Sequence, residues 1–367
     1  MNRPAGGTVL SVSGSFQTQL DRALTPEPWC IDHISFDGSE FEIVGWALAP
    51  GGRHSEIGFT LNEELFETIE FPIARPDVAE VFWFKPGADC AAFHCRTRAT
   101  SEAFRNGYAT LKCVDRNTGQ PVRQEYNWYY PDDRGYPALP DPARRVRVAG
   151  NESAEIFRLE GFTTFTKLDQ ALRRILGRGL GEFDHILDWG CGSGRVTRYF
   201  SGLQNVKLTG ADIDVDNLNW CKRELGFGEF ILIPLHPPTD LRLSSFDLLI
   251  GISVFSHLKE ADQIEWLYEL NRIARPGAVL LMSVLGEATA SRSSWSHSLW
   301  EQWRSSGILC SSNSDLKGYI EDDEYYCNTY LTTDYIRRSW SRFFNIMEIV
   351  PAYIGNQQDL VIMRKPD

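Results

Sequence analysis

The amino-acid sequence predicts a doubly wound α/β sheet that is preceded by a small all-β sandwich. Two observations predict the sheet: strand-like and helix-like segments alternate through the later part of the chain, and a glycine-rich turn follows the first of these strands. One observation predicts the sandwich: from Trp29 to Trp128 apolar residues recur at every second position, and turn clusters separate the runs. A chain of 367 residues is long enough for both units.

The composition along the chain suggests four segments. Residues 1–26 are rich in Gly, Ser and Thr and are expected to form a flexible tail, and residues 27–130 are expected to form the sandwich, with a last strand at 122–128. Residues 131–143 contain four prolines and are expected to form a linker. Residues 144–367 are then expected to form the α/β domain.

In the α/β segment the apolar period switches repeatedly between two and 3.6. Residues 155–176 have the three-four spacing of an amphipathic helix, which we expect to be interrupted at Gly161. The expected strands are 185–189, 206–212, 230–235, 246–252, 279–284, 346–350 and 360–363, and the helices after the first of these strands are 195–203, 216–225 and 261–274.

The stretch 186–195 is predicted to be a strand that enters a helix through Gly190, Gly192 and Gly194. Such a turn needs positive φ angles and leaves bare backbone against a ligand, as in nucleotide sites. The third glycine comes one residue too early for the usual dinucleotide turn. Asp188 stands just before the glycines, where a carboxylate would repel a pyrophosphate but suits an ammonium and a sulfonium. These features favour S-adenosylmethionine over NAD.

A second acidic residue ends the next strand. Asp212 follows Asp188 by 24 residues, at the place where a ribose diol needs a bidentate acceptor. Sites for NAD and for S-adenosylmethionine both use an acidic ribose contact. Asp212 therefore locates the adenosine end of the site without choosing between the two ligands.

From Arg144 to its end the chain resembles class I S-adenosylmethionine-dependent methyltransferases, in the branch with an LDxGCGxGR first motif. The matching stretches are Leu187–Arg195, Ser253–Leu258 with the SVFxHL pattern, and Ala274–Ala278 with an LxPGG-type pattern. The resemblance implies a seven-stranded Rossmann-like sheet. It also implies that the final strand is antiparallel and lies between its neighbours.

A ligand in such a sheet lies across the carboxyl ends of the strands. We assign Asp188 to the methionine ammonium, through a water molecule, Asp212 to the ribose hydroxyls and Ile213 to the adenine ring. The backbone of Gly190, Cys191 and Gly192 is assigned to the methionine carboxylate and the ribose. Trp189, Gly194 and Ser253 complete the candidate cofactor-binding residues.

One position departs from the wider superfamily. An acid or amide often follows the third strand there and reads the adenine amino group, whereas Leu235 and His236 stand here. We therefore expect the adenine to be read by backbone or by His236.

The acceptor is less clearly indicated than the cofactor. A hydroxyl acceptor needs a general base, whereas a carboxylate or a neutral amine needs none. His257, after the fourth strand, is the candidate catalytic base, with a packing role as the alternative, and His297 is a second candidate. The segment 295–330 is rich in Trp and Tyr and is expected to form the lid and acceptor pocket, which suits a sugar ring or a flat aromatic acceptor equally.

The sandwich supplies a second resemblance. Gly45–Ala47 and Ala74–Val78 are similar to an Ig-like module that accompanies bacterial glycan-modifying transferases. Such a module could bind a glycan acceptor, bind a partner protein or stabilise a dimer. Three tryptophans could form a sugar-stacking platform, although aromatic residues on alternating strands are more often core. They are Trp46, Trp83 and Trp128.

Composition excludes several classes of partner. The net charge is −12 without a long basic run, so we expect no nucleic-acid partner. The short basic run 144–148 is expected to be solvated surface, with a role in orienting an anionic acceptor as the minor alternative. No window is apolar enough for a membrane span or a signal peptide, so a cytoplasmic protein is expected. The eight cysteines are scattered and expected to be reduced. Only Cys90 and Cys95, with His94 between them, hint at a metal, and without a second pair no metal site is expected.

The sequence thus predicts an S-adenosylmethionine-dependent methyltransferase that acts on a hydroxyl of a glycan or of a sugar-containing metabolite. One alternative keeps the methyltransferase and makes the acceptor a small natural product. Another alternative is a non-catalytic binding protein with a degenerate methyltransferase fold, against which the intact Asp188, glycines and Asp212 speak. A homo-oligomer stays open.

Overall fold

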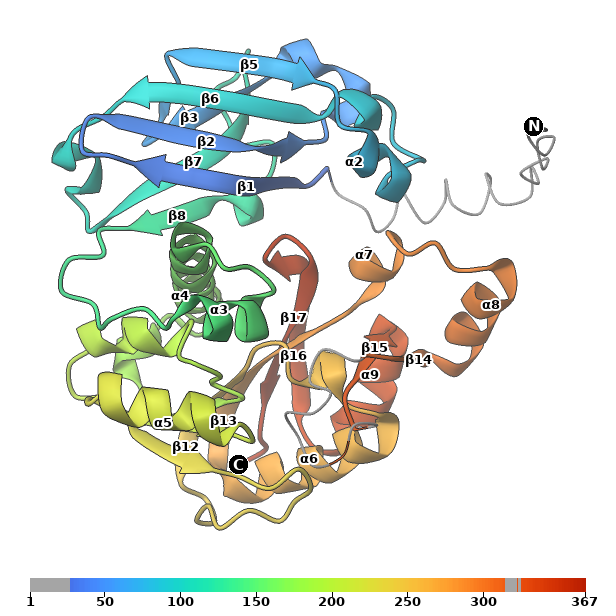
Figure 1. Cartoon of the computed structure of the whole chain (residues 1–367). Helices are drawn as coiled ribbons and strands as arrows, with labels where there is room; N and C mark the ends of the chain where they lie inside the picture. The colour runs from blue at the N-terminus through green and yellow to red at the C-terminus, as the bar shows by residue number, and fades with distance from the viewer. Residues whose placement is uncertain (1–26, 314–321, 323–324) are drawn as a thin grey trace.

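The computed structural model describes residues 27–313, 322 and 325–367. The predicted flexible tail at 1–26 lies outside the described residues, as does part of the aromatic segment 295–330. Figure 1 shows a unit of antiparallel strands above a larger unit in which helices surround a central sheet. The predicted fold class, a doubly wound Rossmann-like sheet preceded by a β-sandwich, is confirmed.

The larger unit is built on a seven-stranded sheet of order β11-β10-β9-β12-β13-β17-β16. The five strands from β11 to β13 are parallel, whereas β17 is antiparallel to both β13 and β16 and lies between them, as the resemblance implied. The chain leaves the sheet in opposite directions from β9 and β12, which is the switch point where ligands bind in such sheets. The strands are β9 (His185–Trp189), β10 (Lys207–Asp212), β11 (Glu229–Leu232), β12 (Phe246–Gly251), β13 (Ala274–Val284), β16 (Asn345–Ile354) and β17 (Gln358–Arg364).

Helices cover both faces of this sheet. Leu187 and Leu249 pack in one cluster with side chains of α6 and α9, whereas their neighbours Ile186 and Leu248 pack in another cluster with side chains of α4. Strands buried on both faces read as continuous apolar runs, which explains their strong signal in the sequence. The helices of this unit are α3 (Pro142–Ala149), α4 (Ala154–Leu176), α5 (Val215–Glu224), α6 (Glu260–Ile273), α7 (Glu287–Ala290), α8 (His297–Ser306) and α9 (Thr333–Ser339), and a two-stranded hairpin consists of β14 (Ile308–Ser312) and β15 (Cys327–Leu331).

The N-terminal unit consists of two four-stranded antiparallel sheets packed face to face. Its core is aromatic: the rings of Phe59 and Phe93, from opposite sheets, have centroids 4.2 Å apart. A short helix, α2 (Pro76–Val81), follows β5. The first sheet has the order β1 (Trp29–Phe36), β2 (Glu40–Ala47), β6 (Ala92–Arg98), β5 (Thr68–Ile73), and the second β4 (Glu64–Leu65), β3 (Ile57–Leu61), β7 (Tyr108–Asp115), β8 (Trp128–Pro131).

The expected strand at 122–128 is wrong. The chain forms a 3₁₀ turn at Gln124–Tyr126, and β8 begins only at Trp128. Tyr126 and Trp128 are both buried, which produced the alternating pattern. The Tyr126 carbonyl accepts a hydrogen bond from the Trp29 indole, 2.8 Å away, instead of joining a strand ladder.

The two units share apolar packing. Ile156 and Leu159 of α4 are buried in the same cluster as the sandwich core, together with Ala352 near the end of β16. The Asn356 side chain donates to the carbonyl oxygen of Trp29 over 2.8 Å, which joins the β16–β17 loop to the first sandwich strand. Figure 1 shows α4 directly below β8.

Helix α4 runs without interruption through Gly161, so the expected break there is wrong. A Cβ at Gly161 would lie 2.2 Å from the backbone oxygen of Arg195. The glycine is therefore needed for the close approach of α4 to the turn after β9. Helix α4 tolerates it because burial outweighs the roughly 1 kcal/mol cost of a helical glycine.

The helix expected at 195–203 is instead a series of turns followed by a 3₁₀ segment, Thr197–Gly202.

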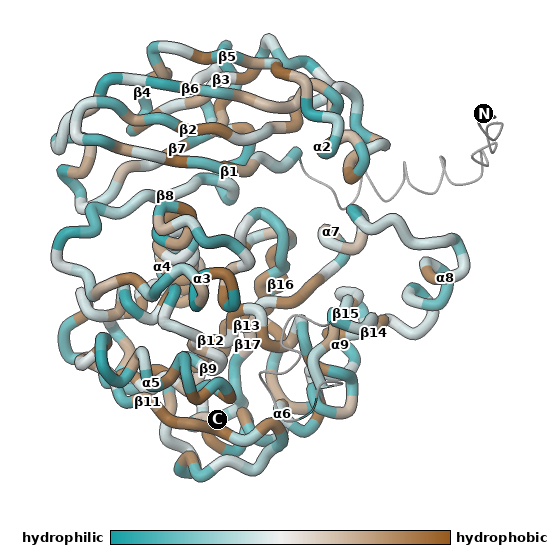
Figure 2. Tube along the Cα trace, in the orientation of Figure 1, coloured by the Kyte–Doolittle hydropathy of each residue, from teal (hydrophilic) through white to brown (hydrophobic). Residues whose placement is uncertain are grey.

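None of the helices in the described residues is both long and apolar enough to cross a membrane. Figure 2 shows strongly apolar stretches inside the larger unit, among them those around β13 and β16.

Candidate active site

A cavity of about 680 Å³ lies at the carboxyl ends of β9, β10 and β12. Helices α3 and α4, the β16–β17 loop and the segment before β15 complete its walls. Among the predicted cofactor residues, Gly194 does not line the cavity. Those that do are Asp188, Trp189, Gly190, Cys191, Gly192, Asp212, Ile213 and Ser253.

The glycine turn has the backbone that its sequence predicted. Gly190, Gly192 and Gly194 have φ angles of 76°, 53° and 84°, which are rarely adopted by residues with a Cβ. The chain also passes close to its neighbours here: a Cβ at Gly190 would lie 2.3 Å from a methyl carbon of Val254, and one at Gly194 would lie 2.6 Å from Leu225. Gly194 therefore serves packing behind the turn.

Asp212 is buried at the end of β10, and backbone groups hold its carboxylate. Oδ2 accepts from the N–H of Gly192 at 2.7 Å, and Oδ1 accepts from the N–H of Asp214 at 2.8 Å. Burial raises the pKa of the Asp212 carboxyl to about 6, and the backbone hydrogen bonds oppose that rise. Each carboxylate oxygen has a second lone pair, so the group can still accept two hydroxyl donors.

Asp188 lies on the neighbouring strand, where it pairs in register with Gly210. Thr197 donates its hydroxyl to Asp188 Oδ2 over 2.6 Å, whereas Oδ1 has no hydrogen-bond partner in the described part of the chain. Burial raises the pKa of the Asp188 carboxyl to about 6. A buried carboxylate with an open acceptor oxygen suits a cationic donor such as an ammonium group.

Helix α3 lies over the glycine turn. Val148 lines the cavity, and its methyl carbon lies 3.1 Å from the place a Cβ would take on Gly192. Arg147 pairs with Asp214 at 3.3 Å and with Asp216 at 2.7 Å, which fastens α3 to the start of α5. Because only 13% of the Arg147 side chain is exposed, the expectation of solvated surface at 144–148 is corrected for this residue. Arg147 is covered because it pairs with Asp214 and Asp216, which lie far from it in the sequence.

Ser253 follows β12 with a φ of 61°, which is uncommon for a residue with a side chain. Its N–H donates to Ser283 Oγ at 2.7 Å, and the Gln358 amide donates to its hydroxyl at 2.9 Å. Ser283 Oγ also donates to Gln358 Oε1 at 2.6 Å. The network joins β12, β13 and β17 at the cavity wall. Gln358 lines the cavity, and no sequence motif pointed to it.

His257 lines the cavity from a 3₁₀ turn, Phe255–His257. Its Nδ1 lies 3.0 Å from the carbonyl oxygen of Cys327, so Nδ1 carries the proton in the neutral ring and Nε2 carries the lone pair. The imidazole stacks on Tyr326 with centroids 4.2 Å apart. The His257 ring is thus held in one orientation on the cavity wall by the Cys327 carbonyl and by Tyr326.

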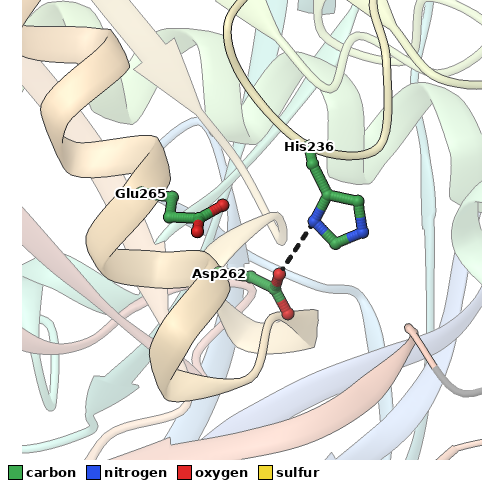
Figure 3. A group of neighbouring side chains, drawn as sticks. All are labelled: His236, Asp262 and Glu265. Carbon is green, nitrogen blue, oxygen red and sulfur yellow. Dashed lines mark ion pairs between the residues drawn. The ribbon is translucent and has the colours of Figure 1, made fainter.

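His236 does not line the cavity, in contrast to the possible adenine contact expected of it. Its Nδ1 lies 3.1 Å from Asp262, and Glu265 lies beside them on α6 (Figure 3). These three residues form a group of potential metal ligands, with ligand atoms within 4.8 Å of one another. Tyr325 separates them from the cavity by packing edge-on against the His236 ring.

Only some residues of the expected aromatic lid line the cavity. Tyr325 and Tyr326 line it, whereas His297 does not. The other aromatic residues in the described part of the segment pack mainly on one another, around α8 and the β14–β15 hairpin. They are Trp295, Trp300, Trp303 and Tyr330.

The three tryptophans for which core packing was favoured over a sugar-stacking platform do not lie together. Trp128 is 3% exposed and belongs to the sandwich core. Trp46 packs on Phe82 with ring centroids 5.3 Å apart, and Trp83 is 54% exposed. The three rings therefore have three different environments.

Residues 187–280 match a family model described as "Methyltransferase domain". The match supports a methyltransferase domain in this part of the chain. The match spans 94 of the 367 residues, from β9 to β13, which includes Asp188, the glycine turn, Asp212 and Ser253. It identifies the part of the sheet whose strand ends form the cavity.

Solved structures similar to the chain include further methyltransferases. An S-adenosylmethionine-dependent methyltransferase from Methanosarcina mazei is 19% identical, covers 50% of this chain and 93% of its own, and has a TM-score of 0.38. One from Mesorhizobium loti is 16% identical over 55% of this chain and 100% of its own, with a TM-score of 0.42. Human N-acetylserotonin methyltransferase in complex with S-adenosylmethionine is 17% identical over 58% and 53%, with a TM-score of 0.37. Because each identity is below 20% and each TM-score below 0.5, the assignment rests on the domain match and on the residues of the cavity.

The residues of the methyltransferase domain fit S-adenosylmethionine, which is the cofactor that the domain match supports. Asp188 offers an open carboxylate oxygen to an ammonium, and Asp212 offers two fixed oxygens to a diol. Ile213, next to Asp212, gives an apolar wall for a flat ring. A pyrophosphate would face both buried carboxylates, which argues against a dinucleotide.

Proposed function

We propose that this methyltransferase transfers a methyl group from S-adenosylmethionine to a hydroxyl of a glycan or of a sugar-containing metabolite. The observation that supports a hydroxyl acceptor best is His257, an oriented imidazole on the wall of the cofactor cavity. A sugar hydroxyl has a pKa far above neutral, so its oxygen becomes a good nucleophile only when a base accepts its proton. The choice of a glycan as the acceptor is supported by the resemblance of the sandwich to an Ig-like module that accompanies glycan-modifying transferases.

In this proposal the chain binds the cofactor through the strand ends. Asp188 accepts from the methionine ammonium, Asp212 accepts from both ribose hydroxyls, and Ile213 contacts the adenine. When bound, the cofactor supplies a methyl group that is activated by its sulfonium. The protein's own contribution is to align the acceptor oxygen for in-line displacement and to keep water out beneath α3.

His257 then acts as the general base. The Cys327 carbonyl holds the Nδ1 proton, and Nε2 accepts the proton of the acceptor hydroxyl as the new carbon–oxygen bond forms. Stacking on Tyr326 limits rotation of the ring. The hydroxyl proton ends on His257, and the neutral sulfide product leaves the cofactor site.

The first test is calorimetric titration of the purified protein with S-adenosylhomocysteine, with NADH as control. We expect micromolar binding of the former and none of the latter. Binding of NADH would overturn the cofactor assignment, and binding of neither would support the degenerate-fold alternative.

Acceptors are then screened by transfer of labelled methyl groups to neutral and acidic saccharides and to small phenolic metabolites. Methylation of phenols alone would replace the glycan by a small natural product.

A further inference from the structure

A second cavity, of about 400 Å³, lies in the seam between the sandwich and the methyltransferase domain. Its upper wall comes from β2 and from α2, and its lower wall comes from α7, the residues that follow α7, and the β16–β17 loop. Figure 1 shows α2 and α7 facing each other across this seam. The cavity thus has walls from two units that are far apart in the sequence.

The seam cavity contains a cation that lacks a carboxylate partner. Arg292 lines it and donates from Nη2 to the carbonyl oxygen of Asn356 at 2.7 Å, whereas its Nε is buried without a hydrogen-bond partner in the described part of the chain. Among the described residues no carboxylate lies within ion-pair distance of Arg292. A buried guanidinium in this state is stabilised by an incoming anion.

The other charged groups of the wall already have partners. Arg75 pairs with Asp77 at 2.8 Å and with Asp32 at 2.7 Å. Asp359 acts electrostatically on Arg292, but burial raises the pKa of its carboxyl to about 7, which makes it a weak counter-ion near neutral pH. Arg292 is therefore the group on the wall that is left to hold an anion.

The rest of the wall is aromatic and polar. The rings of Trp46 and Phe82 lie with centroids 5.3 Å apart, and the Arg292 guanidinium lies 5.4 Å above the Phe82 ring. Aromatic rings contact the CH faces of sugars, and Thr289 and Ser293 add hydroxyl groups to the wall. This combination suits a saccharide that carries a carboxylate or a phosphate.

The seam cavity adjoins the cofactor cavity. Gln357 lines both of them, and Thr289, on the seam wall, donates its hydroxyl to the Gln357 carbonyl at 2.6 Å. An extended ligand that reaches across the β16–β17 loop can therefore place one end in each cavity. An acceptor whose anionic group is bound in the seam cavity gains binding energy far from its reacting hydroxyl. This remote contact orients the hydroxyl in the cofactor cavity.

We propose that the seam cavity binds an acidic sugar residue of an extended acceptor, with Arg292 on its carboxylate or phosphate and with Trp46 and Phe82 against its ring. This inference rests on the proposed function for the acceptor class. The inference goes beyond the proposed function by naming an anionic sugar and a second binding site that contains residues of the sandwich.

The test is calorimetric titration of the full chain, saturated with S-adenosylhomocysteine, with glucuronate, glucose 6-phosphate and glucose. We expect millimolar binding of at least one acidic sugar and at least 10-fold weaker binding of glucose. A preference between the two acids distinguishes a carboxylate from a phosphate. Equal binding of all three, or binding of none, overturns the inference, whereas failure of S-adenosylhomocysteine to bind overturns the proposed function instead.

Two variants locate the site. Arg292→Gln should weaken the acidic sugar at least 10-fold, and so should Val81→Asp, which places a negative charge on an exposed position of the cavity wall. Arg98→Gln is the matched control, because it removes one charge from an 86% exposed side chain outside both cavities. Acidic-sugar binding that survives both cavity variants, with cofactor affinity unchanged, overturns the inference.

Discussion

The backbone N–H of Gly192 donates to the Asp212 carboxylate over 2.7 Å, which joins the glycine turn after β9 to the end of β10. One hydrogen bond therefore fixes the two elements that we assign to the methionine and adenosine ends of the cofactor. The other oxygen of the same carboxylate accepts from the N–H of Asp214, so the carboxylate cannot rotate without breaking a hydrogen bond. Such preorganisation reduces the cost of ordering the site when the ligand binds.

Replacing Asp212 should remove cofactor affinity. In Asp212→Asn the amide NH₂ must face either the Gly192 or the Asp214 N–H, which places two donors against each other, and one acceptor for the ribose is lost. We expect at least a 100-fold rise in Kd for S-adenosylhomocysteine by calorimetry. Asp240→Asn, at an exposed acid outside the cavity, is the control. Wild-type affinity of Asp212→Asn would remove Asp212 from the site.

Cofactor affinity should decrease in acid. The pKa values of Asp188 and Asp212 are both about 6, so near pH 7 the carboxylates are largely ionised and available to the ammonium and ribose hydroxyl donors. Below pH 6 each carboxyl must lose its proton before it can hold its donors as a carboxylate, so the affinity should decrease by up to about 10-fold per pH unit for each of the two groups. Calorimetry between pH 5 and 8 measures this. An affinity that stays constant down to pH 5 contradicts the assignment.

Asp188→Asn should stabilise the free protein while it abolishes cofactor binding. The folded pKa of Asp188 is about 6 and lies above the ordinary value of 3.8, so the folded state binds the extra proton between these values and stability decreases as the pH rises through this window. At pH 7 the ionised group costs about 2–3 kcal/mol, which the amide avoids. Denaturant titrations should show a gain of that order at pH 7 and none near pH 4. A loss of stability at pH 7 would mean that the carboxylate is better solvated than its burial indicates.

Gly161→Ala should damage the site from a distance. Alanine is the better helix former, but its Cβ would meet the Arg195 backbone oxygen at 2.2 Å and push α4 away from the glycine turn. We expect a stability loss of about 1–3 kcal/mol and at least 10-fold weaker S-adenosylhomocysteine binding. The matched control is Gly226→Ala, where a Cβ meets no atom within 4 Å. A neutral Gly161→Ala would show that the helix can shift freely.

His257→Gln should lower turnover on a hydroxyl acceptor without changing cofactor affinity. Glutamine can still donate to the Cys327 carbonyl but cannot accept a proton near neutral pH, so kcat should fall by about 10²- to 10⁴-fold. The control is His236→Gln, outside the cavity. If His257→Gln retains full kcat, or loses activity only through KM, His257 is a packing residue.

Removal of the sandwich should impair folding of the remainder. Residues 132–367 alone would expose Ile156, Leu159 and Ala352, which are buried in the sandwich core, and would leave the Asn356 side chain without Trp29. We expect this fragment to aggregate, and to become soluble when Ile156 and Leu159 are replaced by Gln. A soluble, cofactor-binding fragment without these replacements would show that the shared packing contributes little.

Much of the candidate cofactor site could be predicted from local sequence. Asp188, the glycines and Asp212 lie within a strand, a turn and the next strand, and these short patterns are determined by φ requirements and burial periodicity. The candidate base His257 was likewise close to a strand end. Errors arose where a pattern had a non-local cause. The alternation at 122–128 reflects burial of a turn, and Gly161 reflects a neighbouring loop.

The sequence by itself determined the fold class, the parallel strand ends and the acidic and glycine residues placed on them, because each depends on chain neighbours and on the periodicity of burial. Only the tertiary structure decided that Arg147 lies against Asp214 and Asp216 at the cavity, that Gln358 joins Ser253 and Ser283, and that Arg292 faces a seam with the sandwich. These partners are separated by tens to hundreds of positions. Their contacts depend on how the sheet and the sandwich pack, and no short pattern in the sequence encodes that packing.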